Sequence, residues 1–116
     1  MKPITDTDMI QFVGIKKLDP MDQELINRIS TENFEKIKRK LKNIVKLRVH
    51  IKTYEHEGKQ KKYSIHLQAA APAGILNVDK EAGFDLARTL NKAFENMRQV
   101  IEHTYHQEGE QGTERQ

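Results

Sequence analysis

The sequence predicts an α+β fold, a two-layer sandwich in which two helices cover one face of a four-stranded, mostly antiparallel sheet. Two segments, residues 20–43 and 83–106, repeat apolar residues at steps of three and four, as amphipathic helices do. Between them lie two stretches in which apolar and polar residues alternate, as in strands with one buried face. A short β-prone segment precedes each helix, which gives the order β-α-β-β-β-α.

The first expected strand covers residues 9–15, where the sequence MIQFVGI is apolar and Gly14 predicts a bulge. Asp19 and Pro20 then predict a helix start, because Asp is a favoured N-cap and Pro is favoured at the first helical position. The helix should bury a single stripe of side chains, made of Ile26, Ser30, Phe34, Ile37, Leu41 and Ile44.

A hairpin follows, with a turn at residues 55–60 in which Gly58 can adopt a positive φ. One face of this hairpin is apolar and the other is cationic and polar, so the helices should cover only one side of the sheet. The positions of the first face are Leu47, Val49, Ile51, Thr53, Tyr63, Ile65, Leu67 and Ala69, and they alternate with Arg48, His50, Lys52, Tyr54, Lys62, Ser64, His66 and Gln68.

The last strand is expected at residues 75–79, as a short edge strand with Leu76 and Val78 facing inward. The second helix should then bury Leu86, Leu90, Ala93, Phe94, Met97, Ile101 and Tyr105. Its solvent-facing side should carry Arg88, Lys92, Glu95, Gln99 and His106.

The length of 116 residues fits one domain, which we place at residues 1–107, with a disordered polar tail at residues 108–116. The absence of cysteine excludes disulfides, cysteine-based zinc sites and thiol catalysis. No apolar run approaches the ~20 residues of a membrane span, and the N-terminus lacks a signal-peptide core. We therefore expect a cytoplasmic protein. The complete β-α-β-β-β-α unit leaves no apolar stripe over, so we also expect a monomer.

Positive charge is concentrated in residues 34–67, which hold eleven Lys and Arg against three Glu, whereas the whole chain has a formal net charge of only +3. This asymmetry is typical of a surface that binds a polyanion, and it should join the first helix to the hairpin. The alternative is that the lysines only keep these elements soluble and protect an edge strand from aggregation.

Catalysis and metal binding have little support in the sequence. There is no Gly-rich phosphate loop, nucleophile elbow or paired carboxylate in an apolar frame. His103 and His106 lie three residues apart but lack a third ligand, so we expect no metal and no cofactor. Tyr54 could stack on bases, but Tyr63 is better explained as core. We therefore expect too few aromatic residues on one exposed face for a domain that binds single-stranded RNA by stacking on its bases.

The chain resembles the ribosome hibernation promoting factors, the sigma-54 modulation or S30EA-like family, over residues 9–106. The resemblance rests on the element order, on IQFVG in the first strand, on the cationic first helix and on the segment FDLARTLNKAFENMRQVIEH. Asp85, Leu90 and Asn91 match the family's pattern at the start of the second helix. Ala87 departs from it, since many members carry Tyr there.

This resemblance implies a translation inhibitor that binds the small ribosomal subunit in the tRNA and mRNA channel and acts by steric occlusion, with no small-molecule substrate. It also implies RNA contacts at Lys36, Arg39, Lys40, Lys42, Arg88 and Lys92, to which the basic stretch adds Lys46, Arg48, Lys61 and Lys62. Long members of the family carry a C-terminal dimerisation domain that pairs ribosomes, and this chain ends in a short polar tail instead.

Three other functions remain open. The predicted fold is close to that of the double-stranded RNA-binding domain, so duplex RNA outside the ribosome is the first alternative. A protein-interaction module whose lysines only confer solubility is the second. An enzyme that uses His50 and His66, both on the polar strand face, is the least supported of the three.

Overall fold

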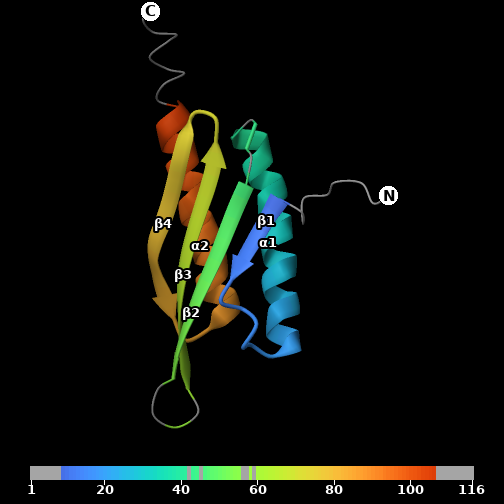
Figure 1. The fold of residues 1–116 in the computed structure, drawn as a ribbon. Coiled ribbons are helices and arrows are strands. Elements are labelled where there is room, and N and C mark those ends of the chain that lie inside the picture. Colours follow the sequence, from blue (N-terminus) through green and yellow to red (C-terminus); the bar gives the residue numbers. More distant parts are fainter. Residues whose placement is uncertain (1–8, 42, 45, 56–57, 59, 107–116) are drawn as a thin grey trace, which may run out of the picture.

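The computed structural model describes residues 9–41, 43–44, 46–55, 58 and 60–106. Of residues 105 and 106 only the backbone is described. The predicted order β-α-β-β-β-α is confirmed (Figure 1). The elements are β1 (Ile10–Val13), α1 (Pro20–Lys40), β2 (Lys46–Glu55), β3 (Lys61–Ala71), β4 (Gly74–Gly83) and α2 (Leu86–Ile101), followed by a π-helical turn, η2 (Glu102–His106).

The four strands form one sheet in the order β1-β2-β3-β4, with both helices on the same face (Figure 1). β1 runs parallel to β2, with Ile10 opposite Leu47, and α1 is the crossover between them. The β2–β3 and β3–β4 pairs are antiparallel. The sheet is therefore mixed but mostly antiparallel, as predicted, and no helix of the described residues covers its second face.

The hydrophobic core lies between the helices and this sheet. Phe34 from α1 and Phe94 from α2 are completely buried against the inward-facing residues of β2 and β3. The two predicted helical stripes are confirmed, since each described member of them is buried. The side chain of Tyr105, also assigned to a stripe, lies outside the described part of the chain.

The first helix ends earlier than predicted. α1 stops at Lys40, and Leu41 is already extended, with φ −114° and ψ 95°, although its N–H still donates to the carbonyl oxygen of Ile37. Asn43 follows with φ 63°, a left-handed conformation that Asn tolerates better than most residues. The chain turns here into β2, and Leu41 and Ile44 reach the core from this turn.

The second helix and the strand before it also differ from prediction. β4 has ten residues rather than five and continues to Gly83, so α2 begins only at Leu86. Asp85 caps it, since its side chain accepts a hydrogen bond of 3.1 Å from the N–H of Arg88. β4 is an edge strand, and its solvated polar residues hid its true length from a search for apolar alternation.

Gly14 ends β1 instead of forming a bulge within it. Its φ is +84°, and a Cβ at this position would overlap the carbonyl group of Ile51 in β2. Only glycine fits such a close backbone approach without strain. The register irregularity of the sheet lies elsewhere, between Ile65 and Leu67 where β3 pairs with β4.

No helix in the described ranges is long and apolar enough to span a membrane. The predicted tail at residues 108–116, the side chain of His106 and the candidate RNA contact Lys42 lie outside the described residues.

Candidate nucleic-acid interface

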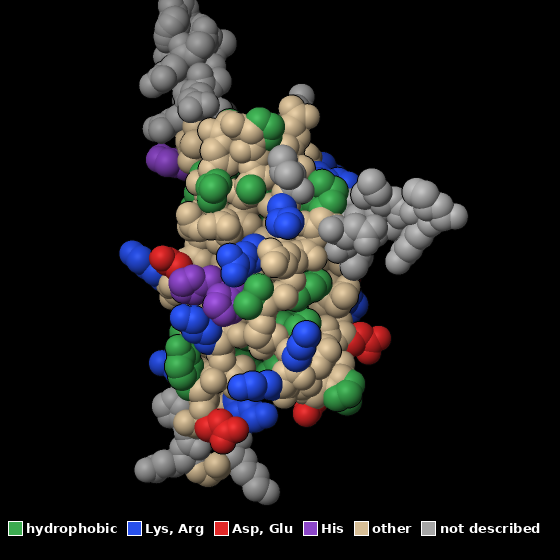
Figure 2. Space-filling model, viewed as in Figure 1, with side chains coloured by type: hydrophobic (Ala, Val, Ile, Leu, Met, Phe, Trp, Pro, Cys, Tyr) green, Lys and Arg blue, Asp and Glu red, His purple; other side chains and the backbone are tan. Residues whose placement is uncertain are grey.

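The helix-free side of the sheet, here called the open face, is built by the residues of β2 and β3 that alternate with the core positions. Leu47, Val49 and Ile51 point into the core, so their neighbours along β2 point the other way. The open face comprises Lys46, Arg48, His50, Lys52 and Tyr54 from β2, and Lys62, Ser64, His66 and Gln68 from β3. Figure 2, which views this side, shows Lys, Arg and His side chains across it.

Positive charge on the open face is not opposed across the β2–β3 pair. In the register, Arg48 lies opposite Gln68 and Lys52 lies opposite Ser64. Lys46 and Lys62 likewise face Ala70 and Tyr54 rather than an acid. The carboxylate of Asp79 belongs to β4, where the residue lies in the irregularity between the Leu67–Val78 and Ile65–Glu81 pairs, with Lys80 next to it in sequence.

Two histidines occupy the centre of the open face. His50 and His66 are directly opposite in the register, and their ring centroids lie 6.1 Å apart. Burial lowers the pKa of His50 below its usual value, and the charges of Lys52, His66 and Arg48 lower it further. Within the described part of the chain, no group of three or more potential ligands could hold a metal ion, so the pair has no third ligand there.

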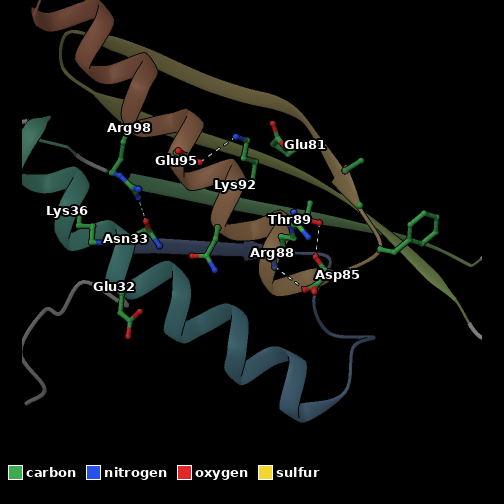
Figure 3. A pocket seen from close by; sticks show the side chains of 14 residues that line it. Glu32, Asn33, Lys36, Glu81, Asp85, Arg88, Thr89, Lys92, Glu95 and Arg98 are labelled. Carbon is green, nitrogen blue, oxygen red and sulfur yellow. Dashed lines mark hydrogen bonds and ion pairs between the residues drawn. The ribbon is translucent and has the colours of Figure 1, made fainter.

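The opposite side of the molecule has a groove between α1, α2 and the end of β4, with a volume of about 940 Å³ (Figure 3). Four of its lining residues are cationic and four are acidic: Lys36, Arg88, Lys92 and Arg98, with Glu32, Glu81, Asp85 and Glu95. The groove therefore has no excess of positive charge in its lining.

Several cations on the helix side are already engaged. The ammonium group of Lys92 lies 3.5 Å from the carboxylate of Glu95, and that of Lys40 lies 3.6 Å from Glu102. The Arg98 guanidinium donates to the side-chain oxygen of Asn33, which is buried in α1 (Figure 3). Such exposed ion pairs are weak, at about 0–1 kcal/mol, but their acids remain near any incoming phosphate.

The ten candidate RNA-binding residues are thus distributed over both layers. Lys36, Arg39, Lys40, Arg88 and Lys92 belong to the helices. Lys46, Arg48 and Lys62 belong to the open face, and Lys61 lies opposite Glu55 near the hairpin turn. Lys42 is not among the described residues. Lys36, Arg39 and Arg88 make no ion pair with a described residue, so they stay available as contacts.

Phe84 is a candidate site residue that the sequence did not reveal. This aromatic residue follows β4 directly and is 53% exposed, and the ammonium group of Lys62 lies 5.9 Å from the centre of its ring. The sequence placed it at the start of the second helix, where it belonged neither to the buried stripe nor to the candidate contacts. A β4 extended to Gly83 would have placed it at the end of the sheet.

Comparison with known proteins adds no identification. A scan against protein-family models and a search of curated proteins both give no match for this chain. What the fold and the candidate site define is a small α+β domain with a cationic, helix-free sheet face. The resemblance to the hibernation factors stays a prediction.

Proposed function

We propose that this protein binds RNA through the open face, that its target is the small ribosomal subunit, and that it inhibits translation by occupying the subunit. The observation that carries the proposal is the row of Lys46, Arg48, Lys52 and Lys62, none of which has a carboxylate opposite it on β2 or β3. The choice of ribosomal RNA over other RNA rests on the resemblance described above.

The open face has the physical properties that phosphate binding requires. Paired β-strands fix the backbone positions from which the four cations project on one side of the sheet. Each cation that neutralises a phosphate releases condensed counterions, which drives binding without any reading of base identity. Inhibition of translation by steric occlusion then requires only that the protein occupies its site on the subunit, and no bond is made or broken.

The helix layer is a weaker candidate for the main contact, although the resemblance places RNA contacts there. Its groove combines four cations with four acids, and a phosphate that approaches Arg88 also approaches Asp85 and Glu95. The potential of the whole surface, rather than the number of lysines, decides whether a polyanion is attracted.

Co-sedimentation tests this proposal. Purified protein is mixed with small subunits, large subunits or an RNA duplex at low and high salt, and its effect on cell-free translation is measured in parallel. We expect association with small subunits that heparin displaces and salt weakens, together with inhibition of translation. Equal binding to any duplex would favour the double-stranded RNA alternative. Absence of binding to every RNA at low salt would exclude RNA binding and favour a protein-interaction module.

A further inference from the structure

The hairpin end of the open face combines cations with exposed aromatic rings. Tyr54 in β2 is 51% exposed and lies directly opposite Lys62 in β3. The Lys62 ammonium reaches toward Phe84, which is similarly exposed and also lines the groove of the helix side, so its ring lies where the two sides meet. An exposed aromatic, a lysine and a second exposed aromatic therefore follow one another across β2, β3 and the end of β4.

A hollow of about 920 Å³ adjoins Tyr54 on its other side. It lies where β1 has ended at Val13 while β2 continues to Glu55, beyond the last pair of the two strands, Val13 and His50. Its lining is mainly apolar, with lysines among it: Phe12, Val13, Ile15 and Ile51, with Lys16, Lys17 and Lys52. Tyr54 also lines this hollow and so stands between it and Lys62.

We propose that this end of the sheet binds unpaired nucleotides of single-stranded RNA, contrary to the expectation from the sequence, which counted Tyr54 but not Phe84 as an exposed ring. One base would enter the hollow against the ring of Tyr54, and a neighbouring base would stack at Phe84. Lys52 and Lys62, with Lys16 and Lys17 at the rim, would neutralise the phosphates between them. This inference rests on the proposed function and deepens it, since it names which form of RNA the open face takes.

The arrangement favours single strands over duplexes for a geometric reason. In a duplex each base is already stacked on both sides, so an exposed protein ring has no base face to contact. Single strands present free base faces, and aromatic platforms with a positively charged path are what proteins use to bind them. Binding of a duplex would be stabilised only by the lysines, through its phosphates.

The composition of this surface also favours RNA over a protein partner. Protein–protein interfaces are enriched in aromatic residues but depleted in lysine at their centres. Here Lys52 and Lys62 flank Tyr54, and Lys16 and Lys17 line the hollow beside it. Burial of these ammonium groups against a protein would require several matching carboxylates, whereas an RNA backbone supplies a phosphate at each nucleotide.

The test measures binding of three labelled probes by fluorescence anisotropy: a uridine decamer, a 16-base-pair RNA duplex and heparin. Tyr54→Leu and Phe84→Leu remove an aromatic face but keep apolar bulk and all charges. Met21→Ala, at an 81% exposed apolar residue at the start of α1, is the matched control. Circular dichroism verifies that each variant is folded.

We expect Tyr54→Leu to weaken decamer binding by roughly five- to 150-fold, the range found when a stacking aromatic is removed. Duplex and heparin binding should change less than twofold, and Met21→Ala should change none of the three. If both leucine variants bind the decamer as the wild type does, the stacking inference is wrong while RNA binding by the open face survives. The same conclusion follows if the leucine variants lose affinity for all three probes to the same extent. If the wild type binds none of the probes, the proposed function fails as well.

Discussion

His50 in β2 and His66 in β3 face each other across the open face, with their ring centroids 6.1 Å apart and their ring planes at 60°. Burial lowers the pKa of His50, and the nearby charges of Lys52, His66 and Arg48 lower it further. The imidazole of His50 is therefore held neutral at a surface that we propose to be a phosphate-binding one. A bound polyanion would raise the pKa of His50, because negative charge nearby stabilises the charged form of the imidazole.

The first prediction concerns the pH dependence of RNA binding. Because phosphates raise the pKa of His50 in the complex, binding should take up protons and tighten as the pH falls from 7.5 to 5.5. The affinity for small subunits, measured at both pH values and one salt concentration, checks this. His50→Gln should reduce the pH dependence. An affinity that is equal at the two pH values would show that no phosphate approaches the histidine pair.

A second prediction concerns the stability of the free protein. Since the folded-state pKa of His50 lies below its unfolded value of about 6.5, the unfolded chain binds more protons in this range. Stability should therefore fall as the pH drops below about 6.5, until the folded-state pKa is passed. Urea unfolding at pH 7.5 and 5.5 should show a larger loss for the wild type than for His50→Gln. The opposite order would mean that the fold stabilises the charged form.

Two phenylalanines provide a matched test of the core. Phe94 is completely buried between α2 and the sheet, whereas Phe84 is more than half exposed. Phe94→Ala should lower the free energy of unfolding by about 3–5 kcal/mol because it leaves a cavity. Phe84→Ala should change it by no more than about 0.5 kcal/mol. A Phe94→Ala loss below about 1 kcal/mol in urea titration would contradict the burial of this ring.

Alanine substitutions at two glycines distinguish the energetic cost of a left-handed backbone conformation from that of a steric overlap. Gly14 and Gly58 have φ of +84° and +75°, but a Cβ at Gly58 meets nothing within 4 Å, whereas one at Gly14 overlaps the Ile51 carbonyl. Gly58→Ala should cost only the left-handed conformation, about 1–2 kcal/mol. Gly14→Ala should cost clearly more, since β1 must also move away from β2. Thermal unfolding of the two variants compares them directly, and equal losses would argue against the close approach at Gly14.

Much of the fold could be predicted because both helices and both central strands bury one regular face. The stripe from Ile26 to Ile37 and the alternation from Leu47 to Ile51 follow from periodicity alone, whereas Leu41 and Ile44 are buried from the turn after α1. The length of β4 could not be predicted in this way, because an edge strand keeps polar residues such as Lys80 and Glu81. The burial of Asn33 was also hidden, since it depends on a hydrogen bond from Arg98, 65 residues away.

The candidate site was only partly predictable. The basic stretch was evident in the sequence. Which of its cations lie on the helix side and which on the open face depends on the side of the sheet toward which each residue of β2 and β3 points. Strand alternation placed Arg48 and Lys52 on the polar face, and the structure agrees. The proximity of Phe84 to Lys62 could not be derived, because it depends on where β4 ends.

The central claim is that the open face, rather than the helix layer, is the main RNA-binding surface. Two charge reversals of equal size test it: Arg48→Glu with Lys52→Glu on β2, and Arg88→Glu with Lys92→Glu on α2. All four residues are exposed, so both variants should fold. The measurement is the affinity for small subunits as a function of salt concentration.

We expect the β2 variant to bind far more weakly than the wild type and to flatten the slope of log affinity against log salt by roughly 1.4–1.8, as two lost phosphate contacts would. The α2 variant should lose much less affinity and keep most of the slope. If the α2 variant instead loses binding while the β2 variant retains both affinity and slope, the open face is not the main RNA-binding surface.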